Sequence, residues 1–227
     1  MSLPPNVHVS KHPCLLAKLS RLRSKDTDAR EVKSLVNDIA LIIGCEAFAS
    51  ALTVADGPKG ETPIGYEYTT TTIRPQELSI VPILRSGLGM VEAVQALLPI
   101  LVPVHHLGLY REPSTLEPVE YYNNLPHHVG TGESGASVSS LAIIVDPVIA
   151  TGGTCAAAIQ TLKEWGVKKI VVLSVIAASE GVRRAAAEWP DVVEIWVAGV
   201  DAELTANGML KPGLGDVGDR LYLTPGK

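Results

Sequence analysis

Residues 146–154 combine an acidic side chain with a turn of small residues, a pattern well suited to ligand chemistry. Leu141–Val145 is a short apolar run with β-branched members, which predicts a strand buried on both faces. Asp146 follows at the carboxyl end of that strand, where open α/β sheets bind their ligands. Thr151-Gly-Gly-Thr154 comes next and precedes a predicted helix over residues 155–165.

A turn of this kind at the start of a helix favours a sugar phosphate. Free backbone N–H groups and the positive end of the helix dipole attract an anion, and glycines let the backbone approach closely. The hydroxyls of Thr151 and Thr154 add neutral donors, and Asp146 can accept hydrogen bonds from vicinal ribose hydroxyls. The plainer interpretation is an ordinary strand, turn and helix with a capping threonine and a solvated aspartate.

A second predicted strand and turn carry an arginine. The apolar run Leu78–Leu84 predicts another buried strand, and Arg85, two glycines and a predicted helix over residues 90–98 follow it. The planar guanidinium of Arg85 can chelate two oxygens at once, which suits a phosphate-rich ligand. The alternative for Arg85 taken alone is a surface ion pair.

Glycine and proline are dense in residues 207–220, and we expect no regular structure there. A tight loop of this composition exposes main-chain N–H and C=O groups, which can recognise a ligand without charged side chains. The alternative is a glycine-rich tail without a function.

Four separated motifs, in order along the chain, resemble those of the uracil phosphoribosyltransferase family. Asp-Pro-x-x-Ala-Thr-Gly-Gly-Thr at residues 146–154 is similar to the loop that binds phosphoribosyl pyrophosphate (PRPP), with Pro147 where most relatives of that fold carry a second acid. Val-Pro-Ile-Leu-Arg-x-Gly-Leu-Gly-Met at residues 81–90 resembles the pyrophosphate loop. The blocks at 109–122 and 212–220 resemble the flap and the uracil-binding signature, so the resemblance covers roughly residues 24–224.

The resemblance implies a role for each motif residue. Arg111 and Asp216 are expected to take part in catalysis. Uracil presents an acceptor, a donor and an acceptor along one edge, and it is expected to contact Leu210, Gly215, Asp216 and Val217 largely through main-chain groups. PRPP is expected to contact Arg85, Arg111, Asp216 and the loop residues Asp146, Pro147, Val148, Ile149, Ala150, Thr151, Gly152, Gly153 and Thr154.

The implied reaction converts uracil and PRPP to UMP and pyrophosphate, a step of pyrimidine salvage. Mg²⁺ is the implied cofactor, held mainly through PRPP and water because it prefers oxygen ligands. Asp216 is the candidate for steering the N1 proton of uracil, and Asp219 and Arg220 are expected to brace the loop. Three positions differ from the usual family pattern: Ser86 stands where Ala is commoner, Met209 where relatives usually have Tyr, and Val217 where Ala or Phe-like residues occur.

The implied fold is α/β and of the phosphoribosyltransferase type. It has a twisted, mostly parallel sheet flanked by helices, a small hood and a β-hairpin flap. Residues 1–20 are expected to form an N-terminal arm, and residues 21–227 a single domain whose hood comes largely from about 201–227.

Local patterns add further elements to this outline. Apolar residues at helical spacing predict a long amphipathic helix from about Asp28 to Leu52, with a capping signal at its start. We also expect a turn over residues 54–60, a hairpin over 62–73 and a strand over 102–109. Residues 131–140 have the low complexity of a surface insertion.

The composition argues for a soluble enzyme. Of 227 residues, 46% are apolar and 19% are charged, which excludes a disordered chain. A net charge of −5 gives no general reason to bind nucleic acid or a membrane surface, and no run approaches the roughly 18 apolar residues of a membrane span. We expect no secretory signal, and three scattered cysteines without CxxC spacing fit the cytoplasm.

Other functions stay open at this point. A regulator of the same fold that senses UMP or PRPP and binds RNA would need a basic face, and 19 basic against 24 acidic residues argue against one. An enzyme for another base, or a homologue that binds without turnover, would share the PRPP motifs. The family resemblance implies a homodimer or homotetramer, and GTP as an effector of some members. The pairs His105–His106 and His127–His128 argue weakly for a metal, because adjacent histidines on a strand point to opposite faces.

Overall fold

The computed structural model describes residues 2–112, 115, 117–126 and 139–224. The side chain of Arg111 lies outside the described part, as do His127, His128 and almost all of the expected insertion over residues 131–140.

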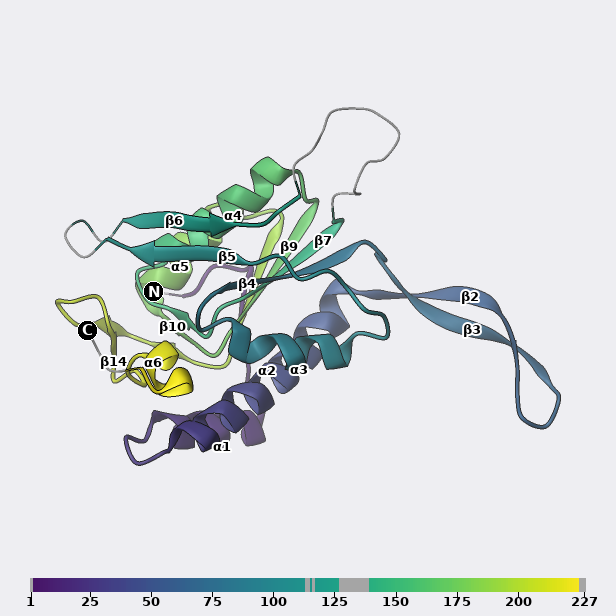
Figure 1. The fold of residues 1–227 in the computed structure, drawn as a ribbon, viewed down its shortest axis with the longest axis horizontal. Coiled ribbons are helices and arrows are strands. Elements are labelled where there is room, and N and C mark those ends of the chain that lie inside the picture. Colours follow the sequence, from purple (N-terminus) through teal and green to yellow (C-terminus); the bar gives the residue numbers. More distant parts are fainter. Residues whose placement is uncertain (1, 113–114, 116, 127–138, 225–227) are drawn as a thin grey trace.

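A seven-stranded sheet forms the centre of the described structure (Figure 1). Neighbouring strands run parallel throughout, except that the last pair, β5 and β6, is antiparallel. The most central strands are the β-branched apolar runs, which are buried on both faces, as parallel strands covered by helices must be. The order across the sheet is β1 (Val7–Val9), β11 (Val193–Val197), β9 (Lys169–Ser174), β7 (Leu141–Val145), β4 (Leu78–Leu84), β5 (Leu107–Arg111) and β6 (Pro118–Asn123).

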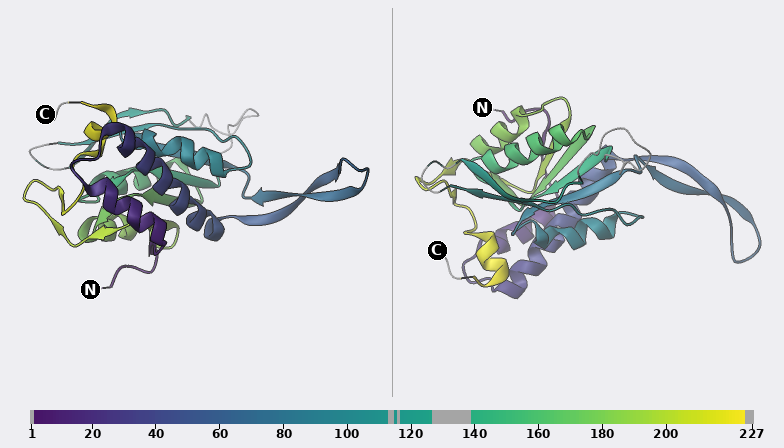
Figure 2. Two further views of the ribbon diagram at one scale, coloured as in Figure 1. Left: turned by 90° about the horizontal axis from the view of Figure 1, so that it is seen from below. Right: turned by 45° about the horizontal axis from the view of Figure 1, so that its top comes forward.

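Helices cover both faces of this sheet, so the fold has three layers (Figure 2). Successive strand residues point to opposite faces: Ile143 joins one hydrophobic cluster, and Ile144 the other. The prediction of a twisted, mostly parallel sheet flanked by helices is confirmed. The first face carries α1 (Pro13–Arg23), α2 (Ala29–Ala51), α3 (Leu88–Leu97) and α6 (Val217–Tyr222), and the second carries α4 (Gly153–Trp165) and α5 (Ser179–Ala187).

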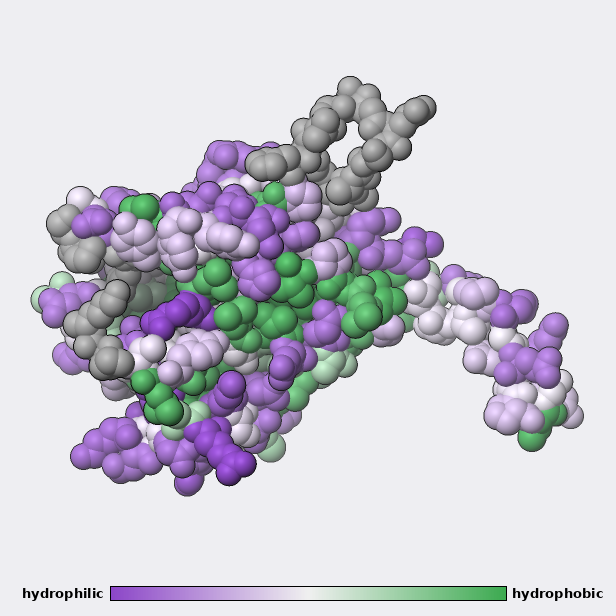
Figure 3. Space-filling view, viewed as in Figure 1, coloured by the Kyte–Doolittle hydropathy of each residue, from purple (hydrophilic) through white to green (hydrophobic). Residues whose placement is uncertain are grey.

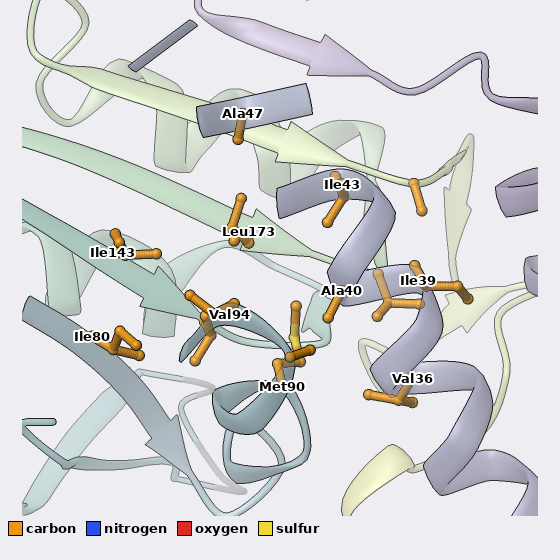
Figure 4. Packing of buried hydrophobic residues seen from close by; sticks show 14 of the residues in the cluster. Val36, Ile39, Ala40, Ile43, Ala47, Ile80, Met90, Val94, Ile143 and Leu173 are labelled. Carbon is orange, nitrogen blue, oxygen red and sulfur yellow. The ribbon is translucent and has the colours of Figure 1, made fainter. Parts of the chain in front are cut away.

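Helix α2 is the predicted long amphipathic helix. It begins after Asp28, whose side chain accepts a hydrogen bond from the Glu31 N–H at 2.8 Å, as the capping signal predicts. Its buried face packs against α3 and the sheet (Figure 4), and burying one side chain such as Ile39 contributes about 1.5–3 kcal/mol. By length and composition α2 could cross a membrane, and in this structure one of its faces is buried in the hydrophobic cluster.

The N-terminal segment differs from the expected arm. β1 pairs in parallel with β11 and forms one edge of the central sheet. Leu15, Leu19 and Leu22 of α1 are buried in the core beside α2. An arm over residues 1–20 is therefore wrong for residues 7–20, because Val7, Leu15 and Leu19 pack in the core of this same chain.

The hairpin starts earlier than predicted. β2 (Thr53–Glu61) and β3 (Glu67–Arg74) form one long antiparallel ribbon that projects from the body (Figures 1 and 2). The expected turn over residues 54–60 is wrong, because an exposed two-stranded ribbon accommodates its glycines and proline with a register shift between Asp56 and Lys59.

The strand expected over residues 102–109 is also shorter in the structure. Val104 makes only an isolated bridge to Ile80, and regular pairing begins at Leu107. Pro103 interrupts the earlier part, since proline has no N–H to donate to a ladder. The expected hairpin flap is present as β5 and β6.

The C-terminal segment contains regular structure that its glycines and prolines concealed. β12 (Val200–Asp201), β10 (Ile176–Ala178) and β8 (Val148–Ile149) form a second, parallel sheet, and β13 (Glu203–Leu204) pairs with β14 (Leu210–Lys211). The expectation of no regular structure over residues 207–220 is wrong at both ends. Asp216 is a good helix cap, and α6 begins directly after it.

Candidate active site

The candidate site lies where the chain order in the central sheet reverses. β4 leads to β5 on one side, whereas its other neighbour, β7, leads away to β9 and β11. Ligands bind beyond the carboxyl ends of the strands at such a switch point. Asp146 directly follows β7 and Ser86 lies two residues beyond β4, and the Ser86 hydroxyl donates a hydrogen bond to Asp146 Oδ1 at 3.4 Å.

Asp146 is buried rather than solvated. The residue is 6% exposed, and its Oδ1 also accepts a hydrogen bond from the Val148 N–H at 3.4 Å. The interpretation of Asp146 as a solvated aspartate is therefore wrong. Its carboxylate is held at the strand end by neighbouring donors, which suits an acceptor that must meet ribose hydroxyls in a fixed place.

The turn after Asp146 delivers backbone N–H groups to the same place. Gly152 is the N-cap of α4 with φ 79°, and no side chain caps the helix. A side chain at Gly152 would meet the backbone of Gly181, because its Cβ would lie 2.2 Å from the Gly181 oxygen. The first N–H groups of a helix have no partners within it, so this end of α4 can donate to an anion.

A pocket of about 360 Å³ separates this turn from the C-terminal segment. The two groups of predicted residues line it from opposite sides. Asp146, Val148, Ile149, Ala150, Thr151, Gly152 and Thr154 line the first wall, and Leu210, Gly215, Asp216 and Val217 line the second.

The second wall is a loop in which Gly215 and Asp216 are exposed, and hydrogen bonds from neighbouring groups hold it in place. Gly215 has φ 78°, and the carboxylate of Asp216 accepts a hydrogen bond from the Asp219 N–H at 3.0 Å as the cap of α6. Arg220 donates to the carbonyl oxygens of Leu22 and Leu214, at 2.7 Å each, and its burial lowers its pKa from the ordinary value. The prediction that Arg220 braces this loop is confirmed.

Arg85 lies beside the pocket and does not line it. Its Nη2 is 3.4 Å from Asp219 Oδ1, and its backbone oxygen accepts a hydrogen bond from the Tyr222 hydroxyl at 3.3 Å. Gly218, which lines the pocket, is its neighbour, since a Cβ on Gly218 would lie 3.9 Å from Arg85 Nη2. Half of the Arg85 side chain is exposed, so its guanidinium is accessible to a ligand that extends from the pocket.

Three other predicted residues lie outside the pocket lining. The carbonyl of Pro147 points to β10, where it accepts hydrogen bonds from the N–H groups of Val175 and Ile176. Gly153 is buried as the first residue of α4. Arg111 ends β5, where its backbone is opposite Pro118 of β6.

Some residues of the pocket have no counterpart in the sequence prediction. Ser86 and Met209 stood out only as departures from the family pattern, although both line the pocket. Ile176 is the first residue of β10 and lies beside Val148 of β8, and no local signal in the sequence marks it as a pocket residue. The remaining unassigned lining residues are Cys155, Pro212, Leu214 and Gly218.

Cys155 is a packing residue in the first wall of the pocket. Its side chain is 2% exposed, and burial together with the nearby charge of Asp146 raises the pKa of the thiol far above its ordinary value. The neutral thiol is therefore the stable form, which does not suit a nucleophile.

The described residues of the pocket do not form a metal site from three or more protein ligands. Within residues 2–112, 115, 117–126 and 139–224, no three His, Cys, Asp or Glu side chains gather to hold an ion. Asp146 and Asp216 are the carboxylates of the pocket lining. This donor set fits a hard cation that brings phosphate oxygens and water as most of its ligands.

Named relatives match the chain over nearly its whole length. A protein of Finegoldia magna named uracil phosphoribosyltransferase is 44% identical over 218 residues, covering 96% of this chain and 98% of that protein. A protein of the same name from Clostridium botulinum is 41% identical over 213 residues, covering 94% and 96%.

Solved structures agree with this match. The AQ2163 protein from Aquifex aeolicus is 31% identical with a TM-score of 0.83, covering 95% of this chain and 97% of that one. An adenine phosphoribosyltransferase from Trypanosoma brucei, solved with AMP, pyrophosphate and ribose-5-phosphate, has a TM-score of 0.52 at 14% identity over 95% and 92%, so it shows the fold alone. The family model described as uracil phosphoribosyltransferase matches residues 9–224, and the chain belongs to this family.

Proposed function

We propose that this protein transfers the phosphoribosyl group of PRPP to uracil, giving UMP and pyrophosphate. The observation that carries the proposal is a single pocket with two unlike walls. One wall has a buried carboxylate and the start of a helix, and the other is a loop in which Gly215 and Asp216 are exposed. The names of the relatives support uracil as the base and UMP salvage as the role.

The first wall is suited to the ribose phosphate. Asp146 would accept hydrogen bonds from the ribose hydroxyls. Thr151 and Thr154 would donate their hydroxyls to the 5′-phosphate, together with the N–H groups at the start of α4. On the second wall, the main chain at Leu210, Gly215 and Val217 would pair with the polar edge of uracil.

The reaction breaks the bond between ribose C1 and the pyrophosphate oxygen and forms a bond from C1 to uracil N1, which loses its proton. Arg85, and Arg111 as implied by the family pattern, would bind the leaving pyrophosphate, whose negative charge grows as the bond breaks. Mg²⁺ carried by PRPP would neutralise part of that charge. Asp216 would orient the N1 proton or accept it at its carboxylate.

A mass-resolved assay with PRPP and Mg²⁺ tests this function. We would offer uracil, cytosine, hypoxanthine and orotate in parallel. UMP and pyrophosphate from uracil alone are expected. Product from another base would overturn the assignment of the second wall, and no product from any base, with or without GTP, would contradict the proposed activity.

We further propose an oligomeric state, an effector and a cellular location for the protein. A homodimer or homotetramer is supported by the projecting hairpin, which exposes Ile64 and Tyr66, and by the apolar area between β5 and α3 (Figure 3). GTP as an effector rests on the family resemblance, and the assay with and without GTP tests it. A cytoplasmic location is supported by three free cysteines.

A further inference from the structure

A partly buried ion pair ties the second wall of the pocket to the end of α1. Arg23 Nη2 is 2.6 Å from Asp201 Oδ1, and Arg23 Nη1 is 3.0 Å from Asp201 Oδ2. This is the two-bond geometry in which a guanidinium and a carboxylate bind most specifically. The Asp201 side chain is 4% exposed and that of Arg23 is 26% exposed, so solvent screens the pair far less than an exposed one.

The same ion pair also binds Gly213, in the loop that forms the second wall, through both polar backbone groups of that residue. The N–H of Gly213 donates to Asp201 Oδ2 at 2.8 Å, and the carbonyl of Gly213 accepts from Arg23 Nη1 at 2.8 Å. Gly213 has φ 65°, and its Cβ would lie 2.3 Å from the Leu210 oxygen, so the loop is closely folded here. Leu214 and Gly215 of the pocket wall follow directly.

Asp201 is also joined to the opposite wall. It ends β12, where it is the register partner of Ala178 in β10. β10 pairs in turn with β8, whose residues Val148 and Ile149 line the PRPP side of the pocket. A short path of hydrogen-bonded strands therefore runs from one wall to Asp201, and from Asp201 to Gly213 of the other.

We propose that Arg23 and Asp201 are positioning residues that set the uracil-binding backbone at its working distance from the PRPP loop. They touch neither substrate and act through Gly213. This inference rests on the proposed function, because the distance matters only if two substrates must meet in the pocket. An error of about 1 Å in such a distance can reduce a rate by roughly a hundredfold.

Two conservative variants separate positioning from simple loss of fold. In Arg23→Lys the charge remains, but one ammonium cannot reproduce the planar fork that reaches both Asp201 and Gly213. In Asp201→Asn the shape remains, but the amide can accept on one side only. Lys18→Met is the matched control, since it breaks an ion pair between α1 and Asp38 of α2 without touching the loop.

The kinetic readout is the KM for each substrate measured separately. We expect both test variants to lower kcat and to raise the KM for uracil by about tenfold or more, while the KM for PRPP changes by less than about twofold. Lys18→Met should change none of these values. A variant that folds and leaves the KM for uracil unchanged, or raises both KM values equally, would overturn the proposal. If Asp201→Asn does not fold, Arg23→Lys decides.

Hydrogen–deuterium exchange gives an answer that does not depend on activity. In Arg23→Lys, the amides of residues 213–217 are expected to exchange about tenfold faster, whereas those of residues 148–154 keep their wild-type rates. Unchanged exchange at residues 213–217 would refute the positioning role of Arg23 and Asp201 even if the wild type makes no UMP. Absence of UMP from the wild type would instead refute the proposed function.

Discussion

Asp216 combines two tasks in one side chain. Its carboxylate caps α6 through the Asp219 N–H, and the residue also lines the pocket. Asparagine caps a helix about as well as aspartate, so Asp216→Asn removes the charge and keeps the cap. We expect the free energy of unfolding to change by less than about 0.5 kcal/mol. Turnover should fall by about tenfold or more.

Unfolding in urea and the rate of UMP formation, measured on the same preparation, check this prediction. Asp216→Ala provides the comparison, because it should also lose about 1 kcal/mol from the missing cap. Wild-type turnover in Asp216→Asn would remove the residue from the reaction.

Arg85 should matter to PRPP and little to the fold. Its pair with Asp219 is half exposed, and such pairs contribute about 0–1 kcal/mol to stability. A hydrogen bond to a charged group contributes about 1.5–3 kcal/mol, so Arg85→Ala should raise the KM for PRPP by roughly ten- to a hundredfold. Arg21→Ala, which breaks the exposed pair with Glu31 away from the pocket, should leave that KM unchanged. Equal kinetics in the two variants would contradict the pyrophosphate assignment.

Cys155 should be unreactive in the folded protein. At about pH 8 a thiol reagent is expected to label Cys14 and Cys45, which are exposed, and to label Cys155 only after unfolding. The pKa of Cys155 is raised in the folded state, so the unfolded state loses the thiol proton first as the pH rises. The buried thiol therefore contributes its full share of stability below the ordinary thiol pKa of 9.0. This contribution is lost as the pH rises above that value. Cys155→Ala should therefore lose less stability between about pH 8 and pH 10 than the wild type. Labelling of all three cysteines in the folded state would contradict this account.

At the scale of elements, the sequence predicted best where one local signal decides the structure. The bounds of β4 and β7 agree with their apolar runs, and α2 begins at its capping aspartate. The predictions over residues 54–60 and 207–220 failed because glycine and proline mark bends and exposed edges as well as loops. The pairing of β1 with β11 could not be predicted, since the partner is nearly 190 residues away and leaves no local signal.

Helix α5 packs closely on the PRPP loop, and a substitution in this helix should therefore affect PRPP binding. A Cβ on Gly181 would lie 1.9 Å from the carbonyl oxygen of Ala150, so Gly181→Ala must push the loop aside. We expect the KM for PRPP to rise by about tenfold, whereas Ala187→Ser on the exposed side of the same helix should have no effect. Equal KM values for PRPP in the two variants would show that the loop tolerates the displacement.

In the molecule as a whole, the order of the strands brings the site residues together. The motifs around Asp146 and Asp216 were visible in the sequence, and the fold brings them to one pocket at the switch point between β4 and β7. Ile176 and the ion pair of Arg23 with Asp201 were not visible, because their partners come from distant strands and helices. Sequence motifs thus predicted the residues that line the pocket better than the residues that hold them in place.

The projecting hairpin supports a prediction about the assembly. β2 and β3 pair chiefly with each other, and the tip exposes Ile64 at 79% and Tyr66 at 69%. Replacing residues 57–70 by a short turn should leave the core folded and reduce the mass of the assembly in sedimentation. An unchanged mass would show that the ribbon does not join copies of the chain.

One pocket should hold both halves of the product, and a crystal structure of the protein with UMP would show whether it does. We predict the phosphate at Thr151–Thr154, the ribose hydroxyls at Asp146, and the edge of uracil against the backbone of residues 210–217. UMP bound elsewhere, or bound with its base against the start of α4, would contradict the account.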